Sequence, residues 1–306
     1  MSASLQVTRT PGRLPSDSVS LALRRGARHV ESLTNRDRRE FLRFVDADPF
    51  VNAALAARLR QVGALAPSAF GGEVLAVRDT DRRLAGAAFH GGNLLPVGGG
   101  PDEWQALAAT VAARPRICTS IVGRATAVEA MWRVLRPSWD PARAIRENQI
   151  LLVLDRSSQL PAGDERVRRI RLGQLEQYLP AAVAMFAEEL GTAPDSTADR
   201  GGYRRRVEAL VRQGRAFGVI EPDGSVIFKA DLAVLSPHTC QVHGVWVRPD
   251  RRRQGVGSSA LAAVLGHALT LAPTVSLYVN DFNIAGRRTY ARLGMREAAI
   301  LSTILF

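Results

Sequence analysis

Two segments in the last third of the sequence carry residues whose types and spacing could do chemistry. The first, QVHGVWVRPDRRRQGVGSSALAAVL, begins with an apolar strand that ends at Val247, turns at a proline, and reaches Gly255 and Gly257 at the start of a helix. Glycines let a ligand approach the backbone closely, and the unpaired amides and dipole of a helix start favour an anion. The pattern predicts a pyrophosphate cradle, with Arg252 and Arg253 adding positive charge. A tight turn without a ligand is the competing interpretation of the glycine pair alone.

The second segment, SLYVNDFNIAGRRTYARLGM, predicts a strand, a turn and a helix. Asn283 lies at the turn, and Tyr290 lies on the helix, four residues before Gly294. The two segments follow one another closely in the chain, so we expect them to build one site.

Together, the two segments resemble the GNAT superfamily. Its phosphate loop has the pattern Gln or Arg, two residues, Gly, one residue, and Gly or Ala, which Arg252, Gly255 and Gly257 match. Asn283 and Tyr290 resemble the family's turn and catalytic helix. The resemblance covers about residues 167–306. It implies an acyl-CoA donor, expected to be acetyl-CoA, and direct transfer of the acyl group to an amine acceptor.

The resemblance also implies how the donor is held. The segments MFAEELG and GVWVRPD resemble one bacterial subfamily, in which an uncharacterised domain precedes the GNAT domain. In the family, the position of Val245 offers its amide to the thioester carbonyl, and the positions of Trp246 and Val247 pair with the pantetheine arm like an added strand. The residues expected to bind the cofactor are Val245, Trp246, Val247, Arg252, Arg253, Gln254, Gly255, Val256, Gly257, Ser258 and Asn283.

Tyr290 is the expected general acid, because by the resemblance it protonates the departing thiolate. Reference pKa values of about 10 for a phenol and about 8.5 for a thiol make this transfer uphill by about 2 kcal/mol. The competing interpretation is a core tyrosine that packs the helix onto the sheet. Met295, which stands where an aromatic residue is commoner in the family, is a departure from the pattern.

The general base is less sharply predicted. The strand position that carries a glutamate in some relatives falls on Gln241, and an amide cannot take a proton. His243 lies two residues on, on the same strand face, and is our first candidate. A histidine satisfied within the sheet is the alternative for that residue. Glu189, or its neighbour Glu188, could act through a water instead, and at least one of them could be a solvated surface charge.

The elements that must position these residues follow from hydrophobic periodicity and turn residues. The first half predicts two consecutive helices within 35–61, strands at 73–78, 84–89 and 94–97, a helix at 102–113, a strand at 117–122, a helix at 125–135 and a strand at 149–154. The second half predicts a strand at 167–171, helices at 175–190 and 203–212, strands at 217–221, 226–234 and 241–247, a helix at 257–271, a strand at 275–279, a helix at 284–293 and a strand at 298–305.

The two halves repeat one order of elements, which predicts a mixed α/β (α+β) fold of two tandem GNAT-like domains. Each is expected to be a mostly antiparallel twisted sheet flanked by helices. Where the second half has its phosphate loop, the first has LLPVGGGPDEW, with Asp102 and Glu103 at a helix start that would need positive charge. We therefore interpret the first copy as degenerate, serving substrate shaping or dimer contacts. The predicted parts are a flexible leader at 1–28, the degenerate domain at 29–155, a linker at 156–165 and the acetyltransferase domain at 166–306.

The charge of the chain does not indicate a nucleic-acid partner. The formal net charge is +12 and the pI about 11.1, but Lys229 is the single lysine, so 40 of the 41 basic residues are arginine. The arginines are scattered and lack interleaved aromatic residues that could stack on bases. An arginine-rich composition explains the charge without nucleic acid, although DNA binding with steep salt dependence stays a third, weaker hypothesis.

The remaining composition predicts a cytoplasmic protein without a metal or membrane segment. Cys118 and Cys240 cannot form a disulfide framework, and no cysteine or histidine cluster has metal-ligand spacing. The longest apolar stretch, 256–275, is interrupted by glycine, histidine and proline, which argues against a membrane span. The expected partners are an acyl-CoA and an amine, and a homodimer is compatible with the sequence. The second functional hypothesis is an acyl-CoA sensor without catalytic activity.

Overall fold

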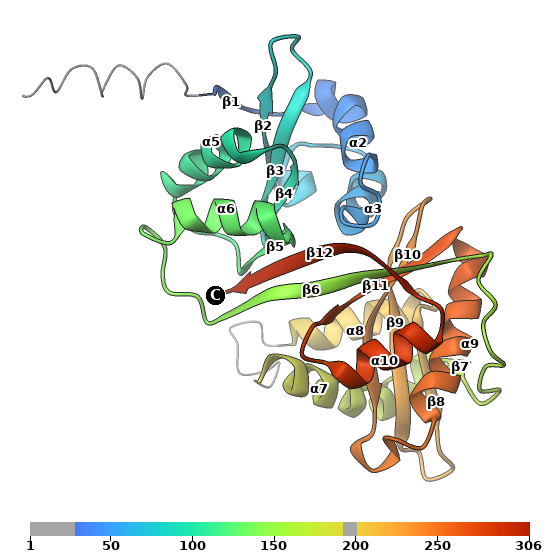
Figure 1. Cartoon of the computed structure of the whole chain (residues 1–306). Helices are drawn as coiled ribbons and strands as arrows, with labels where there is room; N and C mark the ends of the chain where they lie inside the picture. Colours follow the sequence, from blue (N-terminus) through green and yellow to red (C-terminus); the bar gives the residue numbers. More distant parts are fainter. Residues whose placement is uncertain (1–27, 192–200) are drawn as a thin grey trace, which may run out of the picture.

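The computed structural model describes residues 28–191 and 201–306. The described strands form one mixed sheet in the order β1-β2-β3-β4-β5-β12-β6-β11-β10-β9-β8-β7. Figure 1 shows an N-terminal half above and a C-terminal half below, joined where β6 and β12 run side by side. The predicted mixed α/β fold is thus confirmed. The predicted leader lies, except for Arg28, outside the described residues.

The N-terminal half packs its helices around strands β1 to β5. Its first helical turn is fixed by a capping box, in which Thr34 accepts from the Arg36 amide and Asp37 accepts from the Thr34 amide at 2.8 Å. The elements of this half are β1 (Val30–Ser32), α2 (Arg38–Asp46), α3 (Ala53–Val62), α4 (Pro67–Phe70), β2 (Gly72–Arg78), β3 (Leu84–Gly91), β4 (Leu94–Gly98), α5 (Pro101–Ala112), β5 (Ser120–Arg124), α6 (Ala125–Leu135) and β6 (Ala144–Asp155).

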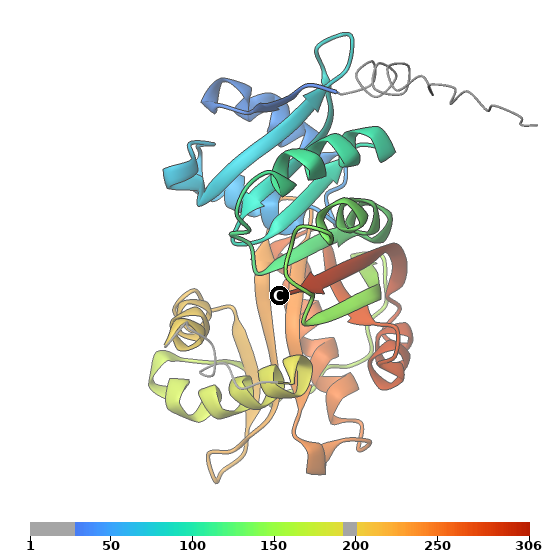
Figure 2. The ribbon, with the colours of Figure 1, turned by 90° about the vertical axis from the view of Figure 1, so that its left-hand side faces the viewer.

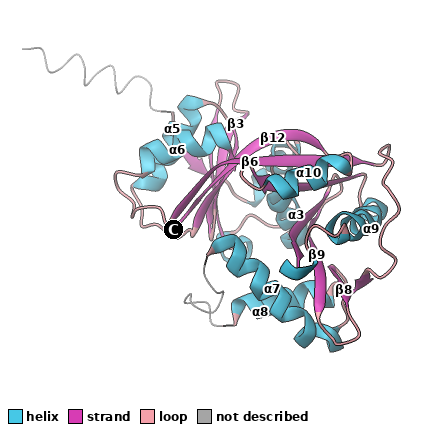
Figure 3. Cartoon of the chain, turned by 60° about the horizontal axis from the view of Figure 1, so that its bottom comes forward, coloured by secondary structure: helices cyan, strands magenta, loops and turns pink. Residues whose placement is uncertain are grey.

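The C-terminal half is a sheet covered on both faces. Helices α7 and α8 pack on one face and α9 on the other, as Figure 3 shows. The elements of this half are β7 (Arg168–Arg169), α7 (Leu175–Leu190), α8 (Gly202–Arg212), β8 (Ala216–Ile220), β9 (Val226–Leu235), β10 (Cys240–Val247), α9 (Val256–Leu271), β11 (Thr274–Asn280), α10 (Ile284–Arg292) and β12 (Arg296–Leu305).

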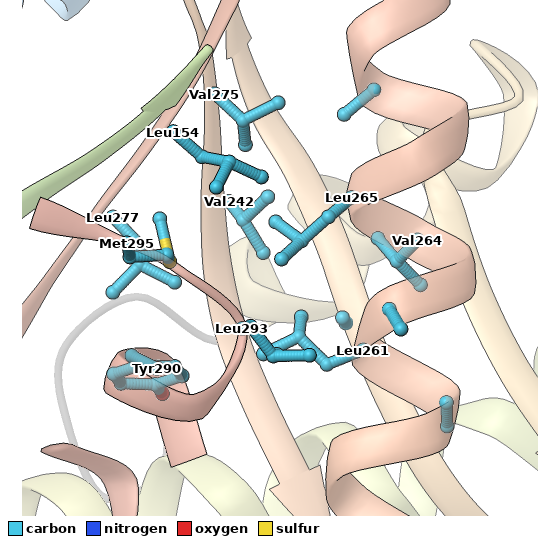
Figure 4. Close-up of a cluster of buried hydrophobic side chains, with 14 of the residues drawn as sticks. Leu154, Val242, Leu261, Val264, Leu265, Val275, Leu277, Tyr290, Leu293 and Met295 are labelled. Carbon is cyan, nitrogen blue, oxygen red and sulfur yellow. The ribbon is translucent and has the colours of Figure 1, made fainter. Parts of the chain in front are cut away.

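Helix α9 is held on the sheet by an apolar stripe with helical spacing. Leu261, Val264 and Leu265 are completely buried and face strand residues that include Val242 and Leu277 (Figure 4). Complete burial of such a side chain stabilises a fold by about 1.5–3 kcal/mol. The start of α9 is therefore fixed against the end of β10, where the sequence predicts the anion cradle.

Strands β6 and β12 cross between the two halves. β6 pairs antiparallel with β11 through residues 149–155, and β12 pairs antiparallel with both β6 and β5. Figure 2 shows this pair at the junction of the halves. The predicted domain boundaries lie at residues 155 and 166. Backbone hydrogen bonds nevertheless join strands from the two sides of these boundaries, because β12 pairs with β5 and β6. The domain limits therefore stay a prediction.

Several element limits differ from the predicted ones. The strand expected at 117–122 is shifted to Ser120–Arg124, because the Thr119 amide and hydroxyl both bond the Gly92 carbonyl in the preceding turn. β6 begins five residues earlier than expected, at Ala144, since its first residues pair with the end of β12. β1 and α4 were not predicted, and each is at most four residues long. Within the two described ranges, no helix is long and apolar enough to cross a bilayer.

Candidate active site

A cavity opens where β10 and β11 diverge. The two strands are parallel and pair only at Cys240 with Val275 and at Gln241 with Ser276. Beyond these pairs lies a cavity of about 420 Å³. Seven of the residues named from the sequence line it, namely Glu188, Glu189, His243, Val245, Trp246, Asn283 and Tyr290. The structure thus brings the predicted acid, the base candidates and the predicted thioester-binding strand to one place.

A bulge in β10 forms one wall of this cavity. His243 pairs with Asp231 and Trp246 pairs with Lys229, so β10 takes three steps where β9 takes two. Gly244, inside the bulge, has a positive φ of 58°. Neither Gly244 nor Val245 has a partner residue in the ladders with β9 and β11. The bulge therefore interrupts strand pairing at the position predicted to meet the thioester.

The loop between β10 and α9 has the form expected of an anion cradle. Arg253 and Gly255 both have positive φ, 63° and 83°, and α9 begins at Val256. The amides of residues 253–257 donate no hydrogen bond within the described chain. A Cβ at Gly257 would lie 3.1 Å from Val247, so glycine lets the helix start lie directly against the strand end. These amides and the helix dipole together suit a diphosphate.

The side chains of the loop divide into engaged and free groups. Arg252 donates to the Val247 carbonyl at 2.9 Å and forms a 2.6 Å ion pair with Glu188. Gln254 donates to the Asp250 carbonyl at 2.8 Å, which stabilises the loop itself. Arg253 is exposed, and its guanidinium has no hydrogen bond or ion pair among the described residues. Of the loop cations predicted to meet an anion, Arg253 is thus the free one.

Tyr290 projects from α10 into the cavity wall and is 8% exposed. Burial, with a smaller contribution from the charge of Glu189, raises the pKa of its phenol to about 12. Its hydroxyl makes no hydrogen bond within the part of the chain that the structure describes. The phenol therefore stays protonated at neutral pH, with its proton available to a bound ligand.

His243 is neutral in this environment. Burial lowers its pKa to about 4, an effect that Asp231 opposes and Lys229 reinforces. Its Nε2 lies 2.9 Å from Oε1 of Gln241, and its ring meets Tyr278 edge-on at 5.3 Å. With the Gln241 amide assigned in this orientation, Nε2 carries the proton and Nδ1 keeps a free lone pair.

The two glutamates at the end of α7 have different roles in the geometry. Glu188 accepts from the indole of Trp246 at 2.9 Å and from Arg252 at 2.6 Å, so it ties α7 to β10 and to the loop. Glu189 lies 3.4 Å from Nη1 of Arg146, which reaches across from β6. Since Glu188 is already held by two donors, Glu189 is the less constrained carboxylate at the cavity.

Asn283 caps α10. Its Oδ1 accepts from the Gly286 amide at 2.9 Å, and a Cβ at Gly286 would come within 2.9 Å of its Nδ2. The small residue at position 286 is therefore required by the cap. The same asparagine lines the cavity, where its amide nitrogen is a donor.

Nine of the residues that line the cavity were not predicted as site residues, and Gln149, Met185 and Tyr278 are among them. Gln149, on β6, donates to Asn280 at 3.0 Å and accepts from Thr303 at 2.5 Å, so it links three strands. Its only signal in the sequence is a polar residue at the head of the apolar run ILLVL. Burial raises the pKa of Tyr278 to about 12, so this second phenol also stays protonated.

The corresponding place in the N-terminal half is filled by the protein itself. β4 and β5 are parallel and pair only at Leu94 with Ile121, but a Cβ on Gly123 would lie 2.9 Å from Cγ of Pro96, so the two strands pack closely beyond this pair. At the start of α5, Glu103 accepts from the Gly100 amide at 2.9 Å and pairs with Arg28. A carboxylate thus occupies the helix start that would receive an anion. These contacts support the prediction that this copy is degenerate.

Comparison with known families gives two matches. Residues 72–178 match the model of a domain of unknown function (DUF4081), and residues 169–295 match the model of the acetyltransferase (GNAT) family. No curated protein sequence matches the chain. In residues 28–191 and 201–306, no group of three or more histidine, cysteine, aspartate or glutamate side chains could hold a metal ion.

Solved structures with the same fold cover nearly the whole chain. A Drosophila protein has a TM-score of 0.64 at 13% identity, covering 91% of this chain and 99% of its own. A GCN5-related N-acetyltransferase from Sphaerobacter thermophilus has a TM-score of 0.58 at 17% identity, covering 90% and 94%. A tandem GNAT protein from the clavulanic acid biosynthesis pathway has a TM-score of 0.53 at 16% identity, covering 90% and 97%. At these identities the likeness establishes the fold alone.

Proposed function

We propose that this chain, whose residues 169–295 match the acetyltransferase (GNAT) family and whose residues 72–178 match DUF4081, transfers an acetyl group from acetyl-CoA to an amine. The observation that carries the proposal is the meeting of three groups at one cavity. The bulge residue Val245, the buried Tyr290 and His243 all line the space between β10 and β11. The transfer is direct, within a ternary complex.

The donor would be held by backbone groups along the open side of β10. The diphosphate fits the free amides of residues 253–257, with Arg253 supplying charge. The pantetheine arm then runs along Trp246 and Val247 as an added strand, which places the thioester at the bulge. The Val245 amide meets the carbonyl oxygen, and its hydrogen bond strengthens as charge develops on that oxygen.

In the reaction, the amine nitrogen attacks the thioester carbonyl carbon, the carbon–sulfur bond breaks, and coenzyme A leaves as a thiolate that takes the proton of Tyr290. With a phenol pKa of about 12 and a thiol reference near 8.5, this transfer is uphill by about 5 kcal/mol. The same desolvation raises the pKa of a thiol within the cavity, which brings the thiol pKa closer to that of the phenol. Tyr290 then recovers its proton from the nitrogen through the base or water.

The base is a weak one in this geometry. His243, with a pKa of about 4, cannot deprotonate a free ammonium group efficiently. The amine therefore binds in its neutral form, and His243 receives the nitrogen proton after attack, when that proton has become far more acidic. Glu189, acting through a water, is the second candidate. Either route makes the rate rise with pH, following the fraction of neutral amine.

The experiment is calorimetric titration of acetyl-CoA and coenzyme A into the wild type and a Gly257→Glu variant, followed by an amine panel. The variant places a negative side chain where the diphosphate would lie and where Val247 is 3.1 Å away. Gly173→Glu is the matched control, since its Cβ meets nothing within 4 Å and it lies outside the cavity. Binding should be retained in the control and lost in the variant. Absence of binding to the wild type would refute the proposal.

A sensor without catalytic activity is the second candidate, favoured by one observation. Each base candidate is weak or engaged, because His243 has a low pKa, Glu188 is held by two donors, and Glu189 pairs with Arg146. The amine panel separates the two functions. It should contain small amines, a peptide with a free N-terminus and a lysine-containing peptide. Tight acetyl-CoA binding without transfer to any of them would establish the sensor.

A further inference from the structure

A buried ion pair lies directly beneath the bulge of β10. Lys229, the single lysine of the sequence, is completely buried on β9 and lies 2.6 Å from Oδ2 of Asp231. The other oxygen of Asp231 accepts from the Tyr178 hydroxyl at 2.7 Å. Removing two charges from water is expensive, and their attraction often fails to offset it. The pair is therefore a poor source of stability, and its position next to the cavity indicates another role.

The ammonium of Lys229 makes one further bond, to the carbonyl oxygen of Gly244 at 3.0 Å. Gly244 and Val245 are the bulge residues that have no partner in the ladders on either side. The lysine thus supplies from β9 the contact that regular pairing would have supplied. Without it, the Gly244 carbonyl would lose this partner.

The direction of this peptide decides what the cavity receives. In a trans peptide, the carbonyl of one residue and the amide of the next point in opposite directions. β9 lies on one side of β10, and β11 lies on the other. Since the Gly244 carbonyl bonds Nζ of Lys229, the Val245 amide points away from that ammonium, and both bulge residues line the cavity.

The residue types fit this function closely. Gly244 has a positive φ, and a Cβ there would lie 2.8 Å from Nζ of Lys229. A lysine ammonium is a compact charge with three rotatable donors, whereas a guanidinium is a wide planar fork. In a chain that uses arginine at its other 40 basic positions, this enclosed site holds lysine.

We propose that Lys229 and Asp231 are positioning residues for acyl transfer, which hold the Gly244–Val245 peptide so that its amide faces the thioester carbonyl. The inference rests on the proposed function, because it assigns the Val245 amide to the developing oxyanion. It adds that the Val245 amide, the hydrogen-bond donor, is aligned by the buried charge of Lys229 on the neighbouring strand.

The test uses the double variant K229M/D231N, which removes the ammonium without leaving a buried carboxylate unpaired. The matched control is T239V/S276A, which removes another buried hydrogen bond of this sheet, the 3.1 Å contact between Thr239 and Ser276. For each protein we would measure kcat, KM, the Kd of coenzyme A, and the infrared carbonyl stretch of bound acetyl-CoA labelled with ¹³C at the carbonyl.

In K229M/D231N, kcat should fall by about a hundredfold, as expected for a lost oxyanion donor, while the Kd of coenzyme A changes by less than about twofold. The carbonyl stretch should return toward the value of free acetyl-CoA, and the control should resemble the wild type. An unchanged stretch and kcat would overturn the proposal, as would a parallel loss of activity and coenzyme A affinity in variant and control. If the wild type binds acetyl-CoA but acetylates no amine, the proposed function fails, and the carbonyl stretch still decides the role of Lys229.

Discussion

Acidification should destabilise this protein through His243. In the unfolded chain, this histidine takes up a proton near its ordinary pKa of 6.5, whereas in the folded protein burial delays protonation to about pH 4. A lowered pKa means that stability is fully present above pH 6.5 and is lost as the pH falls toward 4. The difference between the two pKa values corresponds to at most about 3 kcal/mol, since water in the cavity reduces the desolvation.

The assay is urea unfolding of the wild type and of His243→Gln at pH 7 and pH 4. Other groups also titrate over this range, so the quantity of interest is the difference between the two proteins. The free energy of unfolding should fall by up to about 3 kcal/mol more in the wild type than in the variant, because glutamine has no charge to acquire. An equal loss in both proteins would refute the reasoning and show that His243 is protonated readily in the folded state.

Three further perturbations test the site. Tyr290→Phe should lower kcat by about a hundredfold or more in a steady-state transfer assay with little change in KM for acetyl-CoA, and an unchanged kcat would exclude Tyr290 as the acid. Gly244→Ala should destabilise the protein by more than the about 1–2 kcal/mol of a left-handed alanine, because its Cβ also meets Lys229. Gly63→Ala is the control for the backbone effect alone, because φ there is 70° and nothing lies within 4 Å of the added Cβ. Equal urea midpoints for the two variants would contradict a steric effect of Lys229. Arg253→Ala should weaken coenzyme A binding by about tenfold in calorimetry while changing stability by less than about 1 kcal/mol, because its guanidinium is exposed and has no ion pair among the described residues; unchanged binding or a large loss of stability would oppose this account.

Local pattern predicted the elements that carry the chemistry. Helices α6 and α7 lie at the predicted residues, and α9 begins one residue before the predicted start. The spacing of glycines and the position of Tyr290 placed the cradle and the acid on adjacent elements, because both signals lie within one short stretch of chain. The roles assigned to these residues stay predictions.

What the sequence could not indicate depends on contacts between distant residues. Gln149 bonds Thr303, which is 154 positions away, and no local periodicity encodes such a pairing. The engagement of Glu188 by Arg252 depends on how α7 packs beside the loop. Lys229 stood out as the single lysine, but its significance depends on a bulge in the next strand that a hydrophobic pattern does not reveal.

The interlocking of β6 and β12 limits how the two halves can move. Residues Leu301–Leu305 of β12 are paired with β5, while β6 is paired with both β12 and β11. A hinged opening like that of a clam shell would shear a continuous ladder of backbone hydrogen bonds, unlike rotation about a flexible linker. The cavity wall at Gln149 is consequently tied to β11 by this ladder, so we expect ligands to enter and leave without a hinged opening of the two halves.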